Sequence, residues 1–415
     1  MKVLYLNAYF YPEDLASSYL GHNVREALAN SNVDIVLYAP TPSRGVSEQI
    51  RKEYSTSKKN EVWYDGRMHI HRFSLFKEGK NPLIRAFRYV LVIGKLFNRA
   101  LFDKDAKDCD VMFIPSTPPI MGMMAARIKK RRKVPFVYNL QDIFPDSLVG
   151  TGMTHKGSLL WKIGRRIENF TYRNADKIIV ISQDFKRNIK AKGVPEEKIE
   201  VVYNWVDQNA TVPVKDEDNE LFEEFGVGRD KFRVVYAGNL GNAQNIEIIV
   251  EAAKRLKDNG SIEFVIFGTG GLEDEIKVTK EKEQLDNLKI LPLQPYERVA
   301  KVYGLGNVCI VACKAGLGGA AMPSKTWSIM SAGRAVLANF DEGELKEILE
   351  NNHCGVFTKA DDLDGFVGAI EELSQHPECC AEMGVNGRKF ILENLTREVG
   401  TRKYVDVIKS AVKCS

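Results

Sequence analysis

The feature that most restricts the fold of this chain is a strand that ends in glycines and leads directly into a helix. The segment VVYAGNLGNAQNIEIIVEAAKRL starts at Val234 with β-branched residues, which predict a strand, and then reaches Gly238 and Gly241. From Ile246 onward apolar residues recur with helical spacing. Such a turn presents backbone N–H groups at a helix N-terminus, where the helix dipole favours an anion. This arrangement is typical of nucleotide-binding α/β domains.

The same unit recurs in the second half of the chain. An apolar run, three glycines and a helix start occur within residues 264–276, and a helix and a further strand follow in residues 323–340. Strands and helices also alternate through the first half. Strands joined by helices predict parallel sheets that bind ligands at the carboxyl ends of their strands.

The length of 415 residues predicts two domains, because it exceeds the usual size of one hydrophobic core. A polar, acidic stretch at residues 212–220 marks the linker region. We place a first domain at 1–207 and a second, nucleotide-binding domain at 208–395, followed by a helix at 396–415 that returns to the first domain. Two such domains are expected to face each other across a cleft.

Composition excludes several classes of function. A net charge of +4 does not indicate nucleic-acid binding, and 44% hydrophobic and 27% charged residues are ordinary for a globular protein. Seven cysteines without a CxxC pair predict reduced thiols in the cytoplasm. The chain enters a strand directly after Met1, which does not predict a targeting segment. The longest apolar run, residues 89–97, is too short to span a bilayer.

Five segments together resemble glycosyltransferase family 4: PSKTWSIMSAGRAVLA, AGNLGNAQNIEIIVEAA, FGTGGLEDEI, QDIFPDS and ISQDFKRNIKAKGVPEEKIEVVYNWVD. The resemblance covers nearly the whole chain in the family's order. It implies the GT-B fold, with two Rossmann-like doubly wound domains, and transfer from a sugar nucleotide with retention of configuration. Within the family the chain resembles bacterial transferases of surface polysaccharide, including the N-acetylfucosamine transferases. That likeness implies transfer of an N-acetylated amino sugar from a UDP-sugar to an oligosaccharide or polyprenyl-diphosphate-linked acceptor.

The sequence departs from the family pattern at two places. Many members carry a Glu-x7-Glu pair, which the alignment places at Ala320 and Ser328 here. Many also carry Arg and Lys where this chain has Asn239 and Gln244. A diphosphate still needs cationic or N–H partners, and Lys325 in the PSK segment is the nearest substitute.

We therefore predict a donor site at the turns and helix starts of the second domain. Glu344 is the candidate for contacts to sugar or ribose hydroxyls, and its alternative is a helix-start acid that suits the dipole. The glycines could serve close approach to a ligand or only a tight connection. Asn239 and Gln244 could be ordinary turn residues, and Lys325 a solvated lysine. The predicted donor residues are Gly238, Asn239, Gly241, Gln244, Gly268, Gly270, Pro323, Ser324, Lys325 and Glu344.

Acceptor binding is predicted in the first domain. Asp142 follows a strand and could orient the acceptor hydroxyl or accept its proton; its alternative is a turn aspartate before Pro145. Ser17 and Ser18 lie in the loop after the first strand, where family members often contact a ligand, and either could instead cap the next helix. Asp142 and Lys325 are the predicted catalytic residues.

No obligatory metal or other cofactor is predicted. His69 and His71 point to the same face of a strand, but no further ligand pattern lies near them, so packing is favoured. Residues 216–218, DED, match a D-x-D pattern, but they lie in the acidic linker and are interpreted as a solvated run.

A basic amphipathic helix is expected over residues 82–102. Leu83, Phe87 and Val90 begin an apolar stripe, and Arg88 and Lys95 lie nearly opposite. With the basic run at 127–133, this helix predicts peripheral contact with the anionic inner face of the plasma membrane. The alternative is that the apolar stripe packs on the first sheet.

Two other functions stay open. A non-hydrolysing UDP-sugar 2-epimerase shares the fold and would need no acceptor. A transferase-like partner subunit that has lost turnover would account for the missing Glu-x7-Glu pair.

Overall fold

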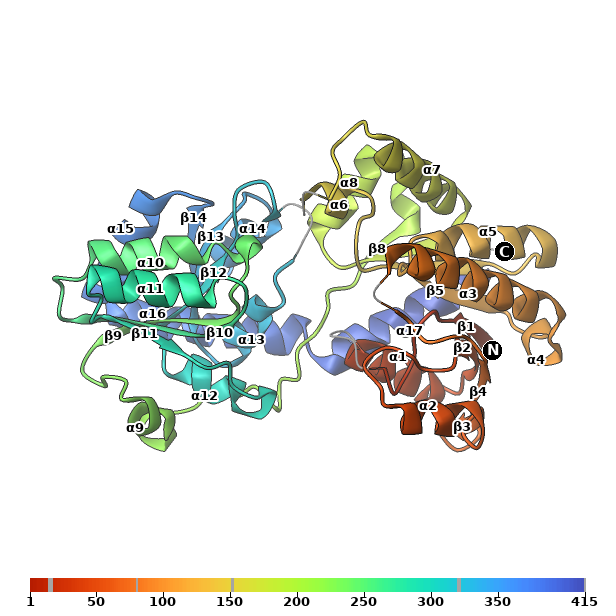
Figure 1. Cartoon of the computed structure of the whole chain (residues 1–415), viewed down its shortest axis with the longest axis horizontal. Coiled ribbons are helices and arrows are strands. Elements are labelled where there is room, and N and C mark those ends of the chain that lie inside the picture. Colours follow the sequence, from red (N-terminus) through yellow and green to blue (C-terminus); the bar gives the residue numbers. More distant parts are fainter. Residues whose placement is uncertain (14–17, 80, 151–152, 319–321, 414–415) are drawn as a thin grey trace. The chain divides into compact units, whose positions relative to one another are not determined.

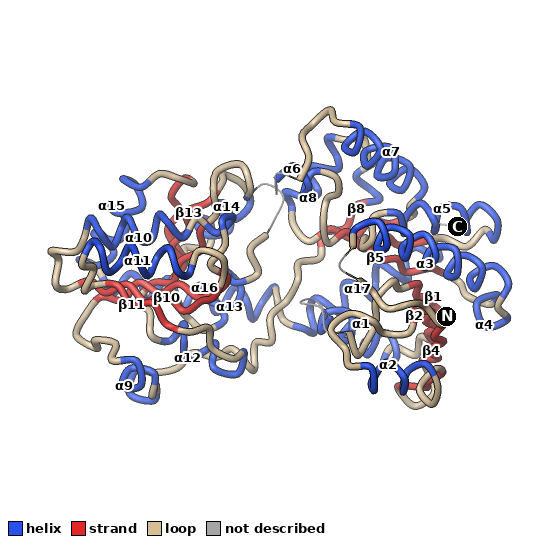
Figure 2. The backbone as a smooth tube through the Cα atoms, viewed as in Figure 1, coloured by secondary structure: helices blue, strands red, loops and turns tan. Residues whose placement is uncertain are grey.

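A computed structural model describes residues 1–13, 18–79, 81–150, 153–318 and 322–413. The chain forms two compact units (Figure 1). The first comprises Met1–Tyr203 and Gly400–Ser415, and the second comprises Asn204–Val399. Each unit is an α/β layer structure built on one sheet (Figure 2).

The sheet of the first unit has the strand order β3-β4-β2-β1-β5-β6-β7-β8, and its pairs are parallel except for β3 with β4. The strand order reverses direction between the central strands β1 and β5, so the topological switch point lies at their carboxyl ends. The strands are β1 (Lys2–Leu6), β2 (Asp34–Pro40), β3 (Asn60–Trp63), β4 (Met68–Phe73), β5 (Val111–Pro115), β6 (Phe136–Leu140), β7 (Lys177–Val180) and β8 (Ile199–Val201).

Helices cover this sheet on both faces because successive strand residues point to opposite sides. Leu4 and Leu6 belong to the core shared with α3 and α5. Tyr5 lies against Phe113, which in turn contacts Tyr404 of α17. The helices are α1 (Ser18–Asn30), α2 (Glu48–Ser55), α3 (Pro82–Phe102), α4 (Lys104–Lys107), α5 (Ile120–Arg132), α6 (Asp146–Gly150), α7 (Leu159–Asn174), α8 (Gln183–Ala191) and α17 (Arg397–Lys413).

The sheet of the second unit is entirely parallel, with the order β11-β10-β9-β12-β13-β14. Its switch point lies between β9 and β12. The strands are β9 (Phe232–Asn239), β10 (Ile262–Thr269), β11 (Leu288–Leu291), β12 (Val308–Ala312), β13 (Ala335–Phe340) and β14 (Gly355–Lys359). The helices are α9 (Leu221–Phe225), α10 (Ile246–Arg255), α11 (Glu273–Glu283), α12 (Val299–Gly304), α13 (Lys325–Ser331), α14 (Glu344–Asn351), α15 (Leu363–Gln375) and α16 (Pro377–Asn394).

The prediction for the basic face of α3 is wrong at Arg88. Arg88, predicted on a solvated basic face, is only 1% exposed. Its guanidinium donates to Ser43 Oγ at 2.7 Å and lies 3.5 Å from Glu78. Phe87 and Val90, which begin the apolar stripe, are 58% and 62% exposed, which contradicts the alternative that this part of the stripe packs on the first sheet. The partners of the buried arginine, Ser43 and Glu78, lie outside the helix, so the periodicity of the helix alone could not reveal it.

The basic run at the end of α5 is also partly structural. Lys129 pairs with Asp176 at 2.6 Å, and Arg132 donates to the carbonyl oxygens of Ala100 and Lys107 at 2.8 and 2.7 Å. Those carbonyls lie at the ends of α3 and α4, where helices leave acceptors unpaired. Arg131 covers the ring of Phe97, with its guanidinium carbon 5.0 Å from the ring centroid.

The interpretation of residues 216–218 as a solvated run is incomplete for Asp216, whose side chain is 40% exposed but also forms ion pairs. This carboxylate pairs with Arg233, a 3% exposed residue, at 2.9 Å and with Arg334 at 3.4 Å. His71 contacts Asn60 and Asp105 and stacks on Tyr38. Among the described residues no cluster of His, Cys, Asp or Glu is placed to hold a metal ion. None of the described helices combines the length and hydropathy that crossing a membrane requires.

Candidate functional site

The switch point of the second sheet gathers several of the predicted donor residues. β9 ends at Gly238 and Asn239, and Lys325 opens α13, the helix that follows β12. The structure brings Lys325 against the end of β9: a Cβ added to Gly238 would lie 2.9 Å from Lys325 Nζ. Gly238 has φ of 149°, a conformation that side-chain-bearing residues rarely adopt.

The Lys325 ammonium is held by an aromatic residue rather than by an acid. Its Nζ lies 3.0 Å from the hydroxyl of Tyr236 and 4.1 Å from the centroid of that ring. Burial lowers the pKa of Lys325 to about 8, and no carboxylate among the described residues forms an ion pair with it. A desolvated cation without an internal counter-ion can accept an anionic ligand without first breaking an ion pair.

Tyr236 is a site residue that sequence reasoning does not find. Its hydroxyl donates to the carbonyl oxygen of Asn239 at 2.8 Å and lies within hydrogen-bond distance of Lys325. Tyr236 therefore connects the lysine to the turn after β9. The only signal in the sequence is that a tyrosine precedes Gly238 by two positions, which places the tyrosine side chain on the face of the strand that Gly238 leaves open.

Asn239 and Gln244, the replacements for the family's cationic pair, contact each other. Asn239 Nδ2 donates to Gln244 Oε1 at 3.2 Å. A Cβ on Gly241 would lie 2.6 Å from the Asn239 amide and 2.8 Å from that of Gln244. The two amides thus close over Gly241 in a short turn before α10. Contact of these three residues with a ligand stays a prediction.

Packing explains the two predicted donor glycines at the carboxyl end of β10, Gly268 within the strand and Gly270 just after it. A Cβ on Gly268 would lie 2.5 Å from the carbonyl oxygen of Gly238, and one on Gly270 would lie 2.5 Å from that of Leu240. The carboxyl ends of β9 and β10, and the residues that follow them, therefore approach too closely through their backbones for a side chain at either glycine. This observation favours a tight connection at both positions over close approach to a ligand.

The remaining donor candidates lie at helix starts. Ser324 is exposed and immediately precedes α13, and Pro323 stands before it. Glu344 is the first residue of α14 and is 2% exposed. That position fits the dipole interpretation directly. The donor roles of all three residues stay predictions.

The acceptor candidates divide between described and undescribed residues. Ser17 lies outside the described residues, and of Ser18 only the backbone, at the start of α1, is described. Asp142 follows β6 at the carboxyl edge of the first sheet and accepts a hydrogen bond from Ser147 Oγ at 3.1 Å. Although this side chain reaches solvent, desolvation by the surrounding protein raises its pKa. Asp146 instead pairs with Lys192 at 2.7 Å, a structural role.

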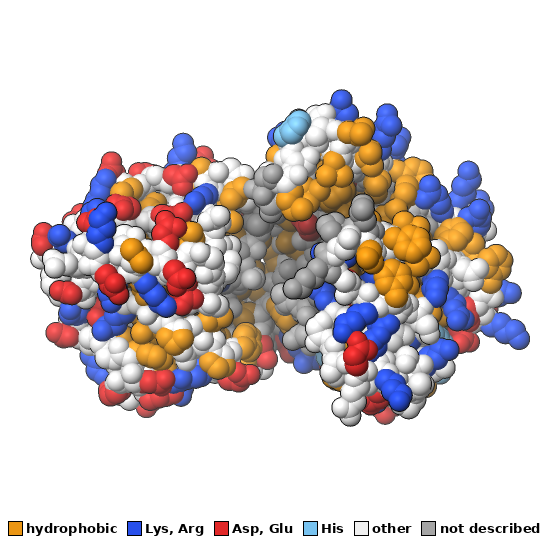
Figure 3. All heavy atoms as spheres, in the orientation of Figure 1, with side chains coloured by type: hydrophobic (Ala, Val, Ile, Leu, Met, Phe, Trp, Pro, Cys, Tyr) orange, Lys and Arg blue, Asp and Glu red, His pale blue; other side chains and the backbone are white. Residues whose placement is uncertain are grey.

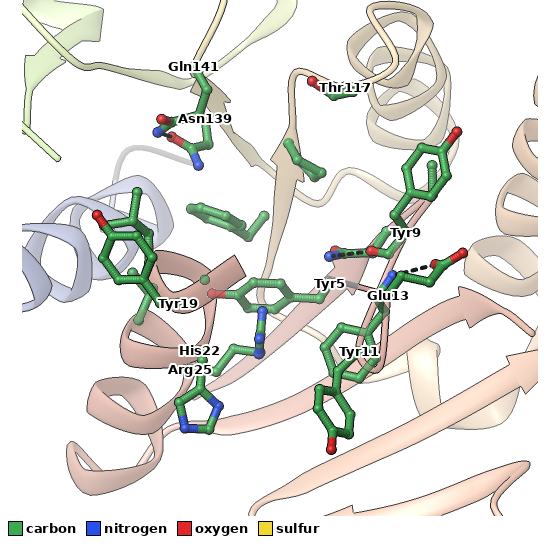
Figure 4. Close-up of a pocket in the computed structure, with 18 of the residues that line it drawn as sticks. Tyr5, Tyr9, Tyr11, Glu13, Tyr19, His22, Arg25, Thr117, Asn139 and Gln141 are labelled. Carbon is green, nitrogen blue, oxygen red and sulfur yellow. Dashed lines mark hydrogen bonds between the residues drawn. The ribbon is translucent and has the colours of Figure 1, made fainter. Parts of the chain in front are cut away.

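A cavity of about 1310 Å³ opens at the switch point of the first sheet (Figure 4). Its walls include residues that follow β1, β5 and β6, namely Asn7, Thr117 and Gln141. Asn139 Oδ1 accepts hydrogen bonds from Tyr404 at 3.0 Å and from Gln141 at 3.0 Å. Acceptor binding in this unit stays a prediction, and the sequence does not reveal the cavity, because the lining residues come from separate segments of the chain.

Two family models match the chain, one after the other. The model described as "Glycosyltransferase Family 4" matches residues 21–210, and that described as "Glycosyl transferases group 1" matches residues 217–390. These ranges correspond closely to the two structural units.

Individual relatives agree with this assignment. The Pseudomonas aeruginosa protein "Probable glycosyltransferase WbjE" is 25% identical over 340 residues, which are 81% of this chain and 83% of that protein. WcaI of Escherichia coli K12, which carries the name of a putative colanic acid biosynthesis glycosyl transferase, is 26% identical over 66% of this chain and 67% of its own length.

Solved structures share the fold. Sucrose-phosphate synthase of Thermosynechococcus elongatus has a TM-score of 0.73 at 13% identity over 100% of both chains. HepE of Anabaena, solved in complex with UDP, has a TM-score of 0.72 at 14% identity over 99% of this chain and 100% of its own. The paired family models, the glycosyltransferase relatives and the two Rossmann-like sheets show that this chain is a glycosyltransferase and belongs to glycosyltransferase family 4, with the GT-B fold.

Proposed function

We propose that this enzyme transfers a sugar from a UDP-sugar to a lipid-linked acceptor in surface polysaccharide synthesis, with retention of configuration. The observation that carries the proposal is Lys325, a desolvated ammonium without an ion-pair partner among the described residues, beside Gly238 at the switch point of the second sheet. Ligands of open α/β sheets bind at such points. The complex of HepE with UDP and the name of WcaI support a nucleotide sugar and a polysaccharide product.

In the proposed reaction the bond between the anomeric carbon and the donor diphosphate breaks, and the diphosphate leaves with the bonding electrons. Lys325 stabilises the negative charge that grows on the leaving oxygen, because a preorganised cation is most effective where charge develops. The acceptor hydroxyl forms the new bond on the same face and gives its proton to the departing phosphate. Asp142 orients the acceptor hydroxyl.

The side chains that this chain supplies do not require a metal for this chemistry. Lys325 supplies one positive charge, and the backbone N–H groups near Gly241 supply hydrogen-bond donors to the diphosphate. We therefore propose that the enzyme needs no obligatory metal or cofactor.

We also propose that the first unit contacts the membrane, through the exposed start of the predicted apolar stripe on α3 together with a second apolar surface on and before α7. On α3 the outward residues Ile84, Phe87 and Val90 are 47%, 58% and 62% exposed. On and before α7, Met153, Leu159, Leu160 and Ile163 are between 46% and 75% exposed. α5 packs against both helices, and Figure 3 shows apolar side chains gathered over this part of the first unit.

Charge on the same unit suits an anionic lipid surface. Arg127, Lys130, Arg131 and Lys133 at the end of α5 are exposed. Each such residue near an anionic membrane contributes about 1 kcal/mol. Exposed apolar patches with a basic rim are typical of peripheral membrane contact. The surface would bring the enzyme to the cytoplasmic face, where a polyprenyl-diphosphate acceptor resides.

Transfer assays with a panel of UDP-sugars test the proposed function. Wild type is expected to transfer sugar only when membrane extract supplies an acceptor, and Lys325→Ala is expected to lose at least about tenfold in turnover while remaining folded. Production of a 2-epimer without acceptor would identify an epimerase instead. UDP binding without turnover under every acceptor would identify an inactive partner subunit.

A further inference from the structure

Arg25 in the wall of the first unit's cavity is a buried cation without a carboxylate partner among the described residues. It lies on α1 and is 7% exposed, and Figure 4 shows its side chain directed from the helix toward Tyr5. Burial lowers the pKa of its guanidinium, which remains charged because arginine does not deprotonate in proteins. A buried charge is costly unless it is paired.

The other buried arginines of the described residues all have an acid within reach. Arg72 lies 2.9 Å from Glu61, Arg88 lies 3.5 Å from Glu78, and Arg233 lies 2.9 Å from Asp216. Arg25 contacts aromatic groups instead: its guanidinium carbon lies 4.9 Å from the centroid of Phe10, and the phenols of Tyr5 and Tyr64 are its polar neighbours. The fold thus neutralises three of these four arginines and leaves the one that lines the cavity.

The carboxylate in the cavity wall is already fully engaged elsewhere. Glu13 accepts hydrogen bonds from the backbone N–H groups of Ser43 at 2.8 Å, Arg44 at 2.9 Å and Phe10 at 3.2 Å. These bonds hold the loop after β1 to the loop after β2. Glu13 therefore serves the wall of the cavity and does not neutralise Arg25.

Unused polar atoms accompany Arg25. Arg25 Nε, Tyr5 Oη and Asn7 Oδ1 are buried, and none has a hydrogen-bond partner among the described residues. All three residues line the cavity, whose apolar wall is largely aromatic and includes Phe10, Trp63 and Phe113. Buried polar atoms are normally paired, and an aromatic cavity with a few convergent polar groups is typical of a ligand site.

We propose that this cavity binds the acceptor through an anionic group seated on Arg25, so that the acceptor is a negatively charged sugar. The proposal rests on the proposed function, in which the first unit holds the acceptor. The guanidinium donates to a phosphate or carboxylate oxygen, and the Tyr5 hydroxyl adds a second donor. The anion is either a phosphate joined to the acceptor sugar or the carboxylate of an acidic sugar.

Calorimetric titration of the full chain with glucose 1-phosphate, glucuronate and glucose tests this site. Either charged sugar should bind at least about tenfold more tightly than glucose. Preference for glucose 1-phosphate would assign the anion to a sugar phosphate, and preference for glucuronate would assign it to a carboxylate. Arg25→Met should abolish that preference and also raise the midpoint of thermal unfolding, because it removes a buried unpaired charge.

Three variants distinguish binding at Arg25 from binding at the donor site and from a purely structural arginine. Lys325→Ala should lose UDP binding and keep charged-sugar binding, whereas Arg25→Met should keep UDP binding and lose the preference for charged sugars. If the wild-type protein binds charged sugars but not UDP, the result counts against the proposed function and not against this site. Arg233→Met, the matched control, should lower the unfolding midpoint by removing the buried end of its ion pair with Asp216 and should leave charged-sugar affinity unchanged. If Arg25→Met does not fold, Tyr5→Phe should weaken binding of the charged sugar about threefold.

Two results would overturn the proposal. One is equal affinity for charged and neutral sugars in wild type, or an unchanged preference in Arg25→Met. The other concerns Asp14, which lies outside the described residues. If Asp14→Asn and Arg25→Met lower the unfolding midpoint equally, and the double variant no further, then Arg25 belongs to an internal ion pair.

Discussion

Replacing Lys325 by methionine should stabilise the ligand-free protein and at the same time weaken nucleotide binding. Methionine has a similar length and no charge, so it removes the desolvation penalty with little change in volume. Burial lowers the pKa of Lys325 from 10.5 to about 8, and each pKa unit corresponds to about 1.4 kcal/mol. The penalty is therefore about 3 kcal/mol. Loss of the Tyr236 hydrogen bond and cation–π contact offsets about 1–2 kcal/mol of it, which leaves a net stabilisation of about 1–2 kcal/mol.

The pH dependence gives the effect a distinct signature. Because folding lowers the pKa of Lys325, the folded state releases this proton first as the pH rises, and the unfolded state then binds more protons. Stability from this group therefore increases between about pH 8 and about pH 10.5. The advantage of Lys325→Met over wild type should be largest below pH 8 and should shrink as the pH approaches 10.

Urea denaturation followed by tryptophan fluorescence, at pH 7 and again at pH 9.5, measures both effects. Trp327, which is 2% exposed and lies two residues from Lys325, reports on the second unit. A Lys325→Met protein that is less stable than wild type at pH 7, or whose difference from wild type does not change with pH, would refute the desolvated, unpaired state of this ammonium.

The remaining predictions concern the turn, the acceptor side, the metal and the membrane. Gly238→Ala should reduce UDP affinity at least about fivefold, because its Cβ would lie 2.9 Å from Lys325 Nζ at a φ of 149°. Gly271→Ala is the control and should keep UDP affinity, because no atom lies within 4 Å of its Cβ. Equal losses of affinity in calorimetry would contradict the role of the turn. Asp142→Asn should lower turnover about tenfold or more with unchanged UDP affinity, and a change in affinity alone would place Asp142 elsewhere. EDTA should leave transfer rates unchanged, and restoration of lost activity by Mg²⁺ would contradict metal independence. Phe87→Ser with Leu159→Ser should reduce co-sedimentation with phosphatidylglycerol vesicles, while Val278→Ser, 63% exposed on the second unit, should not; equal binding by wild type and both variants would argue against the α3–α7 surface.

Much of the fold follows from local signals in the sequence. The strand–glycine–helix units predict β9, β10 and the helices after them, and the structure confirms two α/β units of Rossmann type. Sequence reasoning does not find α2 or the antiparallel edge strand β3. Residues 48–63 are mostly polar, and their apolar residues follow neither the helical nor the strand periodicity strongly. The Ser47 hydroxyl, which accepts from Ile50 N at 3.2 Å, is the available signal for α2.

The site is predictable only in part. Lys325 stands out because it follows proline and serine at a helix start that resembles the family. Tyr236 and Arg25 do not, because their significance depends on the folded surroundings. Tyr236 contacts Lys325, 89 positions away in the sequence, and Arg25 has no carboxylate partner within the described part of the chain. The prediction for Arg88 is wrong for the same reason, since Ser43 and Glu78 set the rotation of α3. Helical periodicity shows where the apolar residues of a helix lie, but it does not show which charged side chains are buried and paired in the folded protein.

Lys325 is the residue on which the donor site depends, through binding of the donor diphosphate at the end of β9. A crystal structure of the protein with bound UDP tests this role most directly. We expect a diphosphate oxygen within about 3 Å of Lys325 Nζ and beside the turn at Gly238. A diphosphate bound elsewhere on the chain, with Lys325 still contacting only Tyr236, would contradict it.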